Sequence, residues 1–171
     1  DPGCVYNYPG FGLTASDIVF DCHGAFINGS GRQGFSGITG FAVRNITVRN
    51  CRIENYRFTT VGLEYGIRME DVEDIAILNN TLINNTGGVI INGTGDGSIS
   101  NRNVSIAFNF MEDIGRGSDF GGSSISLKAN YSSVMNNTLR SCHNCWNVEV
   151  DGARNLIQGN YVFSRIQSDP F

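Results

Sequence analysis

Proline, charged residues and long apolar runs are scarce in this chain, and each scarcity excludes a class of structure. Of the 171 residues only 3 are proline and 16% are charged, whereas 22 are glycine, which is typical of a chain with many turns and few solvated helices. No apolar run approaches the roughly 18 residues that cross a bilayer. No basic cluster is present, and a net charge of −4 with a pI near 5.0 argues against a nucleic-acid or anionic-membrane partner. We therefore expect a soluble protein with no membrane span and no bound nucleic acid.

A repeat organises the sequence. Aligning the segments that start at Asn45, Asp74 and Asn103 brings apolar residues into register at intervals of 29 residues. The aligned residues, extended along the chain, are Phe20, Val48, Ile77, Ile106, Val134 and Ile157. A second apolar position follows them and holds Ile53, Leu82, Met111, Leu139 and Val162. The chain therefore bends between two strands and keeps both apolar faces inward.

The repeat also predicts the fold class. Apolar and polar residues alternate with a period of two within each copy, which is typical of strands with one buried face. A third short strand follows a variable loop, at 66–69, 88–91, 125–127 and 148–150. Because no helical pattern lies between copies, βαβ units are excluded and the copies must stack in parallel. We predict an all-β fold: a single-stranded right-handed parallel β-helix, or β-solenoid, of about six coils. It forms one domain over 1–171, with an N-terminal cap at 1–12, coils at 13–165 and a tail at 166–171.

One bend of the repeat is occupied mainly by asparagine. Successive copies hold Cys51, Asn80, Asn109, Asn137 and Asn160 at this position. Asparagine tolerates the left-handed backbone of a tight bend, and its amide can hydrogen-bond to the equivalent amide of the next coil. Solvated loop asparagines would not recur at one register position. The sequence therefore predicts an asparagine ladder of Asn80, Asn109, Asn137 and Asn160.

Five cysteines in a chain of this size are typical of an oxidising compartment. We predict a disulfide between Cys4 in the cap and Cys22 in the first strand. A second disulfide is predicted between Cys142 and Cys145, where it closes a small loop. Cys51 is then unpaired and buried.

Asn-x-Ser/Thr sequons are frequent. They begin at Asn28, Asn45, Asn79, Asn84, Asn92, Asn103, Asn130 and Asn136. Such an excess indicates N-glycans on the surface of a secreted protein, although an Asn-Asn-Thr turn selected for β-helix packing would create sequons as a by-product. The chain begins at Asp1 without an initiator methionine or a signal peptide, so we expect a processed chain. The sequons and the cysteines together predict an extracellular or cell-surface location.

These segments resemble a known group of proteins. Residues 13–31, LTASDIVFDCHGAFINGSG, look like the first coil of the right-handed parallel β-helix repeat proteins of the pectin-lyase-like superfamily. Asn-Asn-Thr at 79–81 and 136–138 is similar to the hallmark of their Asn-rich secreted and cell-surface members. The resemblance covers roughly 13–165 and implies the fold. It implies little about function, because the superfamily includes polysaccharide lyases, glycosidases, epimerases, carbohydrate-binding modules and structural rods.

The sequence offers no clear catalytic group. A glycosidase needs two or three carboxylates that converge on one face. The weak candidates are Asp21, Arg49, Glu70, Asp71 and Asp74. Asp21 and Arg49 are expected on adjacent coils, where a surface ion pair is the simpler interpretation. The acidic stretch 70–74 could bind calcium, but a solvated turn is simpler. We predict a non-enzymatic protein without catalytic residues.

Two further groups have simple structural explanations. The Cys-x-x-Cys segment at 142–145 could form half of a zinc site with His143, but the chain has only one other histidine, so four ligands are hard to assemble. Trp146, Tyr131 and Tyr161 could form a platform on which sugars stack, although packing is the simpler role for a lone tryptophan beside a small loop. No metal and no cofactor are predicted.

An apolar stripe crosses adjacent coils on the outer face. It consists of Ala76, Leu78, Ala107 and Met135. Exposed apolar patches mark interfaces, but the loops 94–102 and 113–122 could instead cover this one. The ends of a β-helix expose unpaired backbone groups. We therefore predict a structural subunit that self-associates through its ends or its stripe into a filament or cell-surface structure. The alternatives are a carbohydrate-binding or polysaccharide-processing module of lyase or hydrolase type, and an adhesin-like domain of a larger surface protein.

Overall fold

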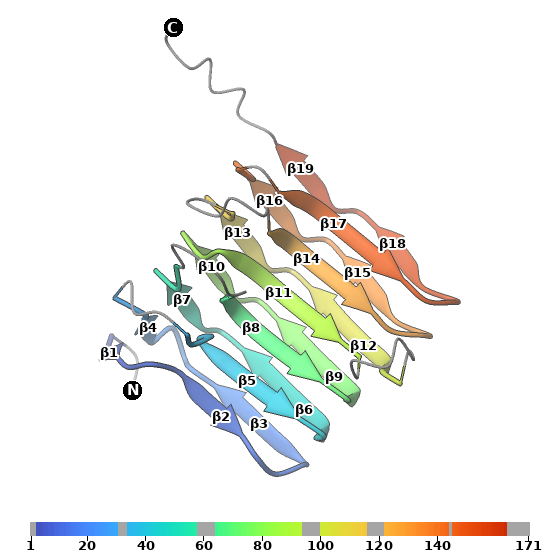
Figure 1. Ribbon diagram of the computed structural model, residues 1–171, viewed down its shortest axis with the longest axis horizontal. Helices are drawn as coiled ribbons and strands as arrows, with labels where there is room; N and C mark the ends of the chain where they lie inside the picture. Colours follow the sequence, from blue (N-terminus) through green and yellow to red (C-terminus); the bar gives the residue numbers. More distant parts are fainter. Residues whose placement is uncertain are drawn as a thin grey trace, which may run out of the picture.

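The chain winds into a parallel β-helix with three faces (Figure 1). The computed structural model describes residues 3–30, 34–57, 64–93, 100–115, 122–143 and 145–163. These residues form 19 strands and no helix. None of them therefore belongs to a helix long and apolar enough to cross a membrane.

The strands make three sheets in which all pairs are parallel. Sheet A contains β1 (Val5–Asn7), β4 (Phe26–Asn28), β7 (Arg52–Glu54), β10 (Thr81–Ile83), β13 (Phe110–Glu112), β16 (Thr138–Arg140) and β19 (Tyr161–Phe163). Sheet B contains β2 (Phe11–Leu13), β5 (Ile38–Phe41), β8 (Tyr65–Glu70), β11 (Gly87–Asn92), β14 (Ser123–Lys128) and β17 (Trp146–Asp151). Sheet C contains β3 (Ile18–Asp21), β6 (Arg44–Arg49), β9 (Glu73–Leu78), β12 (Arg102–Ala107), β15 (Ser133–Met135) and β18 (Leu156–Gln158). The chain visits sheets B, C and A in turn, so about six right-handed coils stack as the repeat predicted.

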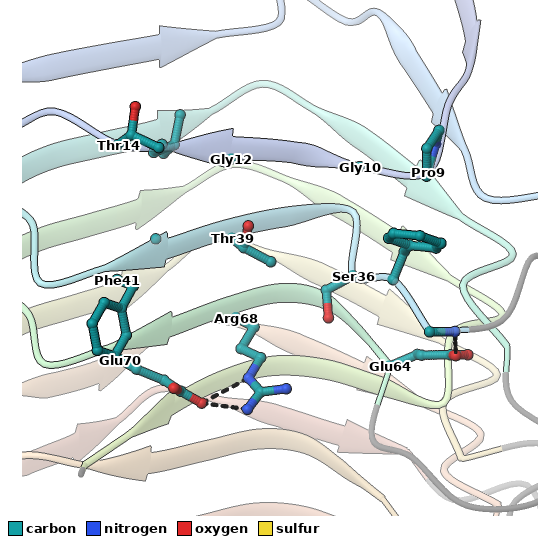
Figure 2. Close-up of a pocket in the computed structure, with 14 residues that line it drawn as sticks. Pro9, Gly10, Gly12, Thr14, Ser36, Thr39, Phe41, Glu64, Arg68 and Glu70 are labelled. Atoms are coloured by element: carbon teal, nitrogen blue, oxygen red, sulfur yellow. Dashed lines mark hydrogen bonds and ion pairs between the residues drawn. The ribbon is translucent and has the colours of Figure 1, made fainter.

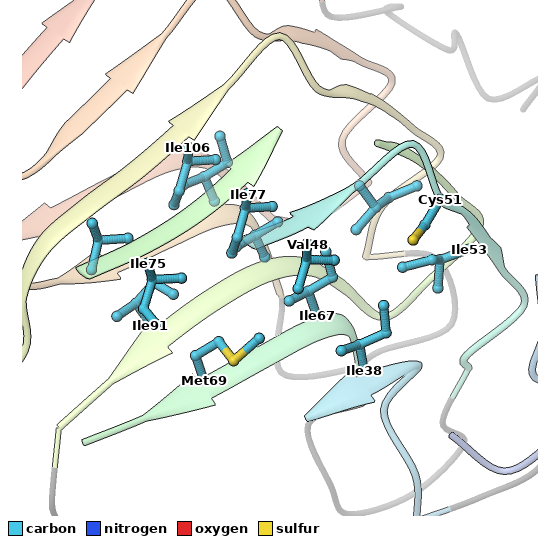
Figure 3. Packing of buried hydrophobic residues seen from close by; sticks show 14 of the residues in the cluster. Ile38, Val48, Cys51, Ile53, Ile67, Met69, Ile75, Ile77, Ile91 and Ile106 are labelled. Atoms are coloured by element: carbon cyan, nitrogen blue, oxygen red, sulfur yellow. The ribbon is translucent and has the colours of Figure 1, made fainter. Parts of the chain in front are cut away.

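The core is a column of aliphatic side chains, one layer per coil (Figure 3). In sheet C, Val48 pairs with Ile77 and Ile77 with Ile106, which confirms the predicted register. These three side chains have no exposed surface. Complete burial of each contributes roughly 1.5–3 kcal/mol, so the hydrophobic effect fixes which residue of each strand faces inward.

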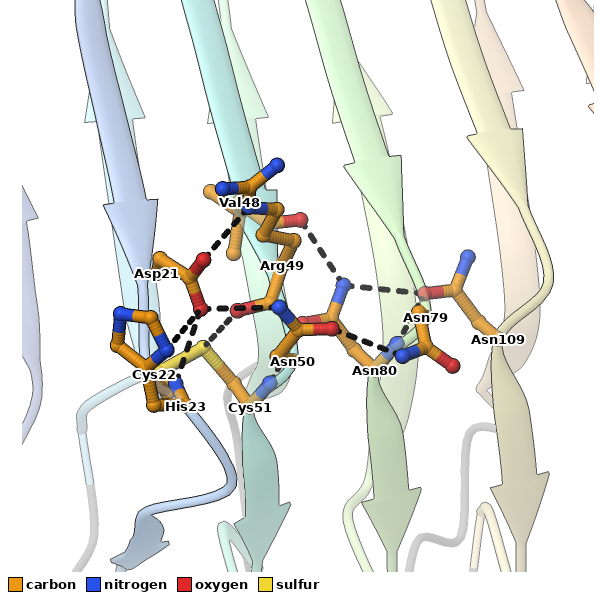
Figure 4. The surroundings of a disulfide bond; sticks show 10 residues. All are labelled: Asp21, Cys22, His23, Val48, Arg49, Asn50, Cys51, Asn79, Asn80 and Asn109. Carbon is orange, nitrogen blue, oxygen red and sulfur yellow. Dashed lines mark hydrogen bonds and ion pairs between the residues drawn. A yellow bond between two sulfur atoms is a disulfide. The ribbon is translucent and has the colours of Figure 1, made fainter. Parts of the chain in front are cut away.

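The predicted asparagine ladder lies inside this column, at the bend between sheets C and A (Figure 4). The Nδ2 atoms of Asn80, Asn109 and Asn137 each donate to the Oδ1 of the next asparagine toward the C-terminal end, at 2.9–3.0 Å. Each ladder amide also satisfies backbone groups: Asn109 accepts from the backbone N–H of Asn80 at 2.9 Å and donates to the carbonyl of Ile77 at 2.9 Å. The ladder therefore satisfies buried backbone groups that the bend removes from the sheets.

Further side-chain ladders lie on the surface and run the other way. At the outside of the same bend, Asn79 Nδ2 donates to Asn50 Oδ1 at 2.8 Å, and Asn50 Nδ2 donates to Asp21 Oδ1 at 2.9 Å. After sheet A, donation again runs toward the N-terminal end, along Asn84, Asn55, Asn28 and Asn7. Asn50, Asn55, Asn79 and Asn84 have φ between 53° and 64°, a region that asparagine adopts more readily than most residues.

The prediction of an N-terminal cap is wrong. Residues 1–12 were expected to cap the helix, but Val5–Asn7 pairs with Phe26–Asn28 and Phe11–Leu13 pairs with residues 38–40, so both segments extend the sheets. Their hydrogen bonds continue the strand ladders, which is why they coil rather than cross the end. The predicted tail at 166–171 lies outside the described residues.

The predicted disulfide between Cys4 and Cys22 is also wrong. Cys22 is bonded to Cys51, with their Cα atoms 4.8 Å apart, and Cys4 is the free cysteine. The two bonded cysteines are 29 residues apart, which is one period of the repeat. Stacking therefore places Cys51 at the same bend as Cys22, in the next coil. Cys142 and Cys145 are bonded to each other.

Candidate functional site

A cleft lies on the outer face of sheet B, over β2, β5 and β8 (Figure 2). Its volume is about 620 Å³, which is within the range of small-ligand sites. The alternation of the strands creates its lining: Ile38, Ile67 and Met69 point into the core, so Thr39, Phe41, Arg68 and Glu70 point outward. Parallel pairing then sets Thr39 beside Arg68, and Phe41 beside Glu70.

The cleft combines aromatic rings with polar groups. Phe41 is 65% exposed and Phe35 is 50% exposed, which is unusual for phenylalanine. Arg68 donates from Nε to Glu70 Oε1 at 2.7 Å. An exposed ion pair of this kind adds little to stability, so a ligand can share its donors and acceptor at small cost. Aromatic faces beside neutralised charges are suited to a ligand that is partly apolar and rich in hydroxyl groups.

Glu64 forms part of the cleft wall and is almost completely buried, at 2% exposure. Its Oε1 accepts from the backbone N–H of Gly34, whereas its buried Oε2 has no hydrogen-bond partner within the described residues. Burial raises the pKa of the Glu64 carboxyl, and hydrogen bonds from the backbone of Gly34 and Phe35 oppose that rise.

Glu64 and Glu70 do not form a catalytic acid and base pair. They lie before and at the end of β8, so six residues of extended chain separate their Cα atoms by roughly 20 Å. Figure 2 shows them at opposite ends of the cleft, with Arg68 between them. The two carboxyl groups of a glycosidase pair are separated by roughly 5–9.5 Å. Two glutamates at opposite ends of a cleft, with Cα atoms roughly 20 Å apart, do not come that close. The cleft therefore holds one carboxyl group near each end.

The candidates Asp21 and Arg49 lie on adjacent coils, and Arg49 Nε is 2.7 Å from Asp21 Oδ2 (Figure 4). The side-chain hydrogen bond from Asn50 is the largest cause that lowers the pKa of Asp21 to about 2, followed by the backbone N–H of His23. Asp21 is thus held as a carboxylate at the end of a surface ladder. It lies on sheet C, away from the cleft.

The other acidic candidates do not gather at one site. Glu70 lies in the cleft, whereas Asp71 accepts from Ser100 Oγ at 2.8 Å and Asp74 accepts from Asn103 Nδ2 at 3.0 Å. Both aspartates have positive φ; Asp71 lies between β8 and β9, and Asp74 is the second residue of β9. Among the described residues, no three acidic, histidine or cysteine side chains are grouped to hold a metal ion.

The aromatic platform that was considered as an alternative is not formed. Trp146 begins β17 in sheet B, Tyr161 begins β19 in sheet A, and Tyr131 lies before sheet C, where its hydroxyl accepts from Arg154 at 2.9 Å. Trp146 is 72% exposed, so the prediction that it packs beside the small loop is wrong. Cys142 and Cys145 form a disulfide, so their thiols cannot serve as ligands of the zinc site that was considered. The Nε2 atom of His143 lies 3.2 Å from Oδ1 of Asp113.

The apolar stripe is narrower than predicted. Leu78, Ala107 and Met135 pair in one column, but Ala107 is only 2% exposed and Ala76 stands in the next column beside Ser105. The loops 94–102 and 113–122 were considered as a cover for the stripe. Most of their residues, 94–99 and 116–121, lie outside the part of the chain that the structure describes.

Sequence reasoning missed most of the cleft. The outward positions of β5 and β8 follow from the period of two, so Phe41 and Arg68 could have been found by extending the register to the third strand. Glu64 precedes its strand after a variable loop, and no pattern marks it. No protein-family model, curated protein or solved structure matches this chain.

Proposed function

We propose that this chain is an extracellular β-helix that binds a neutral polysaccharide along the cleft of sheet B without cleaving it. The single observation that carries the proposal is the pair of exposed phenylalanine rings in a cleft of about 620 Å³, with Phe41 beside Glu70 of the Arg68–Glu70 ion pair and Phe35 toward Glu64. Rings of this kind stack on the apolar faces of sugars. Because Arg68 and Glu70 offset each other in charge, a neutral chain suits the cleft better than a uronide.

The extracellular location is supported by two disulfides and by the sequons. The fold, together with the segments at 13–31, 79–81 and 136–138, supports placing the chain in the pectin-lyase-like superfamily. The roughly 20 Å between Glu64 and Glu70 supports a binding module rather than a lyase or hydrolase.

Replacing Phe41 with alanine is expected to weaken binding of a neutral β-glucan about tenfold, because one stacked ring contributes up to roughly 1.5 kcal/mol. Isothermal titration calorimetry measures the change. Phe108→Asn is the matched control, since Phe108 is similarly exposed at 61% but lies outside the cleft, at a bend position where neighbouring coils hold asparagine. Equal affinity of both variants and the parent protein, or binding of polyuronides alone, would contradict the proposal.

A second candidate function, a structural subunit that stacks end to end, is favoured by apolar residues of the first and last described coils. Ile157 and Val162 are in register with the fully buried Val134 and Leu139, yet they are 53% and 47% exposed. At the opposite end, an apolar hollow of about 230 Å³ is lined partly by Phe11 and Phe20. Head-to-tail contact between such unlike ends would generate a filament. Electron microscopy and sedimentation test this, because Ile157→Asp should abolish any concentration-dependent assembly.

A further inference from the structure

The eight sequon asparagines divide into two groups of four by exposure. Asn45, Asn79, Asn103 and Asn136 are exposed, whereas Asn28, Asn84, Asn92 and Asn130 are half-buried. The exposed four share a left-handed backbone, with φ of 51–54°.

The four exposed asparagines border one face. Asn45 and Asn103 lie at the beginning of the sheet C strands β6 and β12, and Asn79 and Asn136 directly follow the ends of β9 and β15. The two rows alternate, so each coil from the second to the fifth carries one exposed sequon. Within a row, Asp74 separates Asn45 from Asn103, and Phe108 separates Asn79 from Asn136. Residues of one row are thus two coils, about 9.6 Å, apart, which leaves room for two attached sugars.

The hydrogen bonds of the exposed group are compatible with a glycan. N-glycosylation forms a bond between Nδ2 and the anomeric carbon of a sugar carried on a phosphate leaving group. The sugar–phosphate bond breaks, the phosphate departs with the bonding electrons, and Nδ2 loses one of its two protons. One N–H remains, which is all that Asn79 and Asn103 need for donation to Asn50 and Asp74.

The half-buried group has less freedom. Asn28 donates from Nδ2 to Asn7, and its Oδ1 accepts from both Ser30 and Asn55. Asn84 donates to Asn55 at 2.6 Å, and its Oδ1 is buried. Asn92 ends a paired strand in the middle of sheet B, beside Glu70. Oδ1 of Asn130 accepts from the backbone N–H of Ala153 at 2.8 Å.

We infer that Asn45, Asn79, Asn103 and Asn136 are the glycosylation sites, and that their glycans form two rows that enclose the outer face of sheet C. The inference rests on the extracellular location in the proposed function. Leu78, Ala107 and Met135 then lie beneath the glycans, which makes this stripe unsuitable for contact between copies. Sheet B, which holds the cleft, is the face left open to a ligand.

The test is expression in an insect secretory host, with a flexible C-terminal Asn-Gly-Thr tag as a control acceptor. The folded, secreted protein is analysed by intact mass and glycopeptide mapping. Thr47→Ala, Thr81→Ala, Ser105→Ala and Thr138→Ala each remove one sequon without changing its asparagine. Each is expected to remove the mass of one glycan and leave the melting temperature unchanged, whereas Ser30→Ala, which removes the Asn28 sequon, should leave the mass of the glycans unchanged.

Glycans found chiefly at Asn28, Asn84, Asn92 or Asn130, or a modified tag on an otherwise bare chain, would overturn the inference. Polysaccharide binding is measured on the same material and separates the two proposals. The expected glycan pattern without binding would remove the proposed function of the cleft and retain the glycan-covered face. Polysaccharide binding by a chain whose glycans lie at other asparagines would retain the proposed function of the cleft and remove the glycan-covered face.

Discussion

Replacing Asn109 with leucine is expected to lower the free energy of unfolding by about 3–5 kcal/mol, although leucine has a similar size. The substitution leaves the backbone N–H of Asn80 and the carbonyl of Ile77 without the partners that Asn109 supplies at 2.9 Å. Each buried polar group left unpaired costs roughly 1–3 kcal/mol. Urea unfolding of the unglycosylated protein, followed by circular dichroism, measures the loss.

Asn79→Gly is the matched control for this ladder variant. Asn79 belongs to the exposed ladder at the same bend, and glycine readily adopts its φ of 53°. We expect a change within about 1 kcal/mol, because water replaces the lost amide partner. If the two variants were equally stable, the buried ladder would contribute no more than the exposed one, and its stabilising role would be refuted.

Removal of the disulfide with Cys22→Ala and Cys51→Ala is expected to cost about 3.5 kcal/mol, because the bond closes a loop of about 30 residues in the unfolded chain. A second double variant, Cys22→Ala with Cys51→Asn, should recover about 1 kcal/mol of this loss. Cys51 occupies the first ladder position, and its backbone N–H already donates to Asn80 Oδ1 at 3.0 Å. An asparagine side chain there can add the amide donation that each later rung makes.

Because both double variants lack the disulfide, the difference between their free energies of unfolding measures the contribution of the added asparagine alone. Guanidinium unfolding of the two proteins, under identical conditions, gives the difference. A Cys51→Asn variant less stable than its alanine counterpart would show that the ladder cannot extend to this coil.

The sequence predicted the sheets well because stacking is periodic. The aligned residues Val48, Ile77 and Ile106 had to share one layer, since any slip of one residue would turn every side chain of the strand to the other face. The same argument located the rungs at Asn80, Asn109, Asn137 and Asn160, which hydrogen-bond as expected.

Prediction failed where the spacing is irregular. Val5 pairs with Phe26 and Phe11 with Ile38, at separations shorter than the repeat, so the first strands were mistaken for a cap. That error led to the pairing of Cys4 with Cys22, although the interval between Cys22 and Cys51 equals one period. The cleft draws Glu64 and Phe35 from segments beside variable loops, which no periodic pattern can align.

The opposite directions of the buried and exposed ladders have an electrostatic consequence. Each donating amide adds a small dipole along the axis, and the buried row of Asn80, Asn109 and Asn137 points opposite to two surface rows, one through Asn79 and Asn50 and one through Asn84 and Asn55. Aligned dipoles sum in an α-helix to partial charges at its ends, whereas rows of opposite direction largely cancel. Asp21 supplies a negative charge where one surface row presents its last N–H group. The buried row therefore reduces the field that the surface rows add along the rod as side-chain stacking is repeated over many coils.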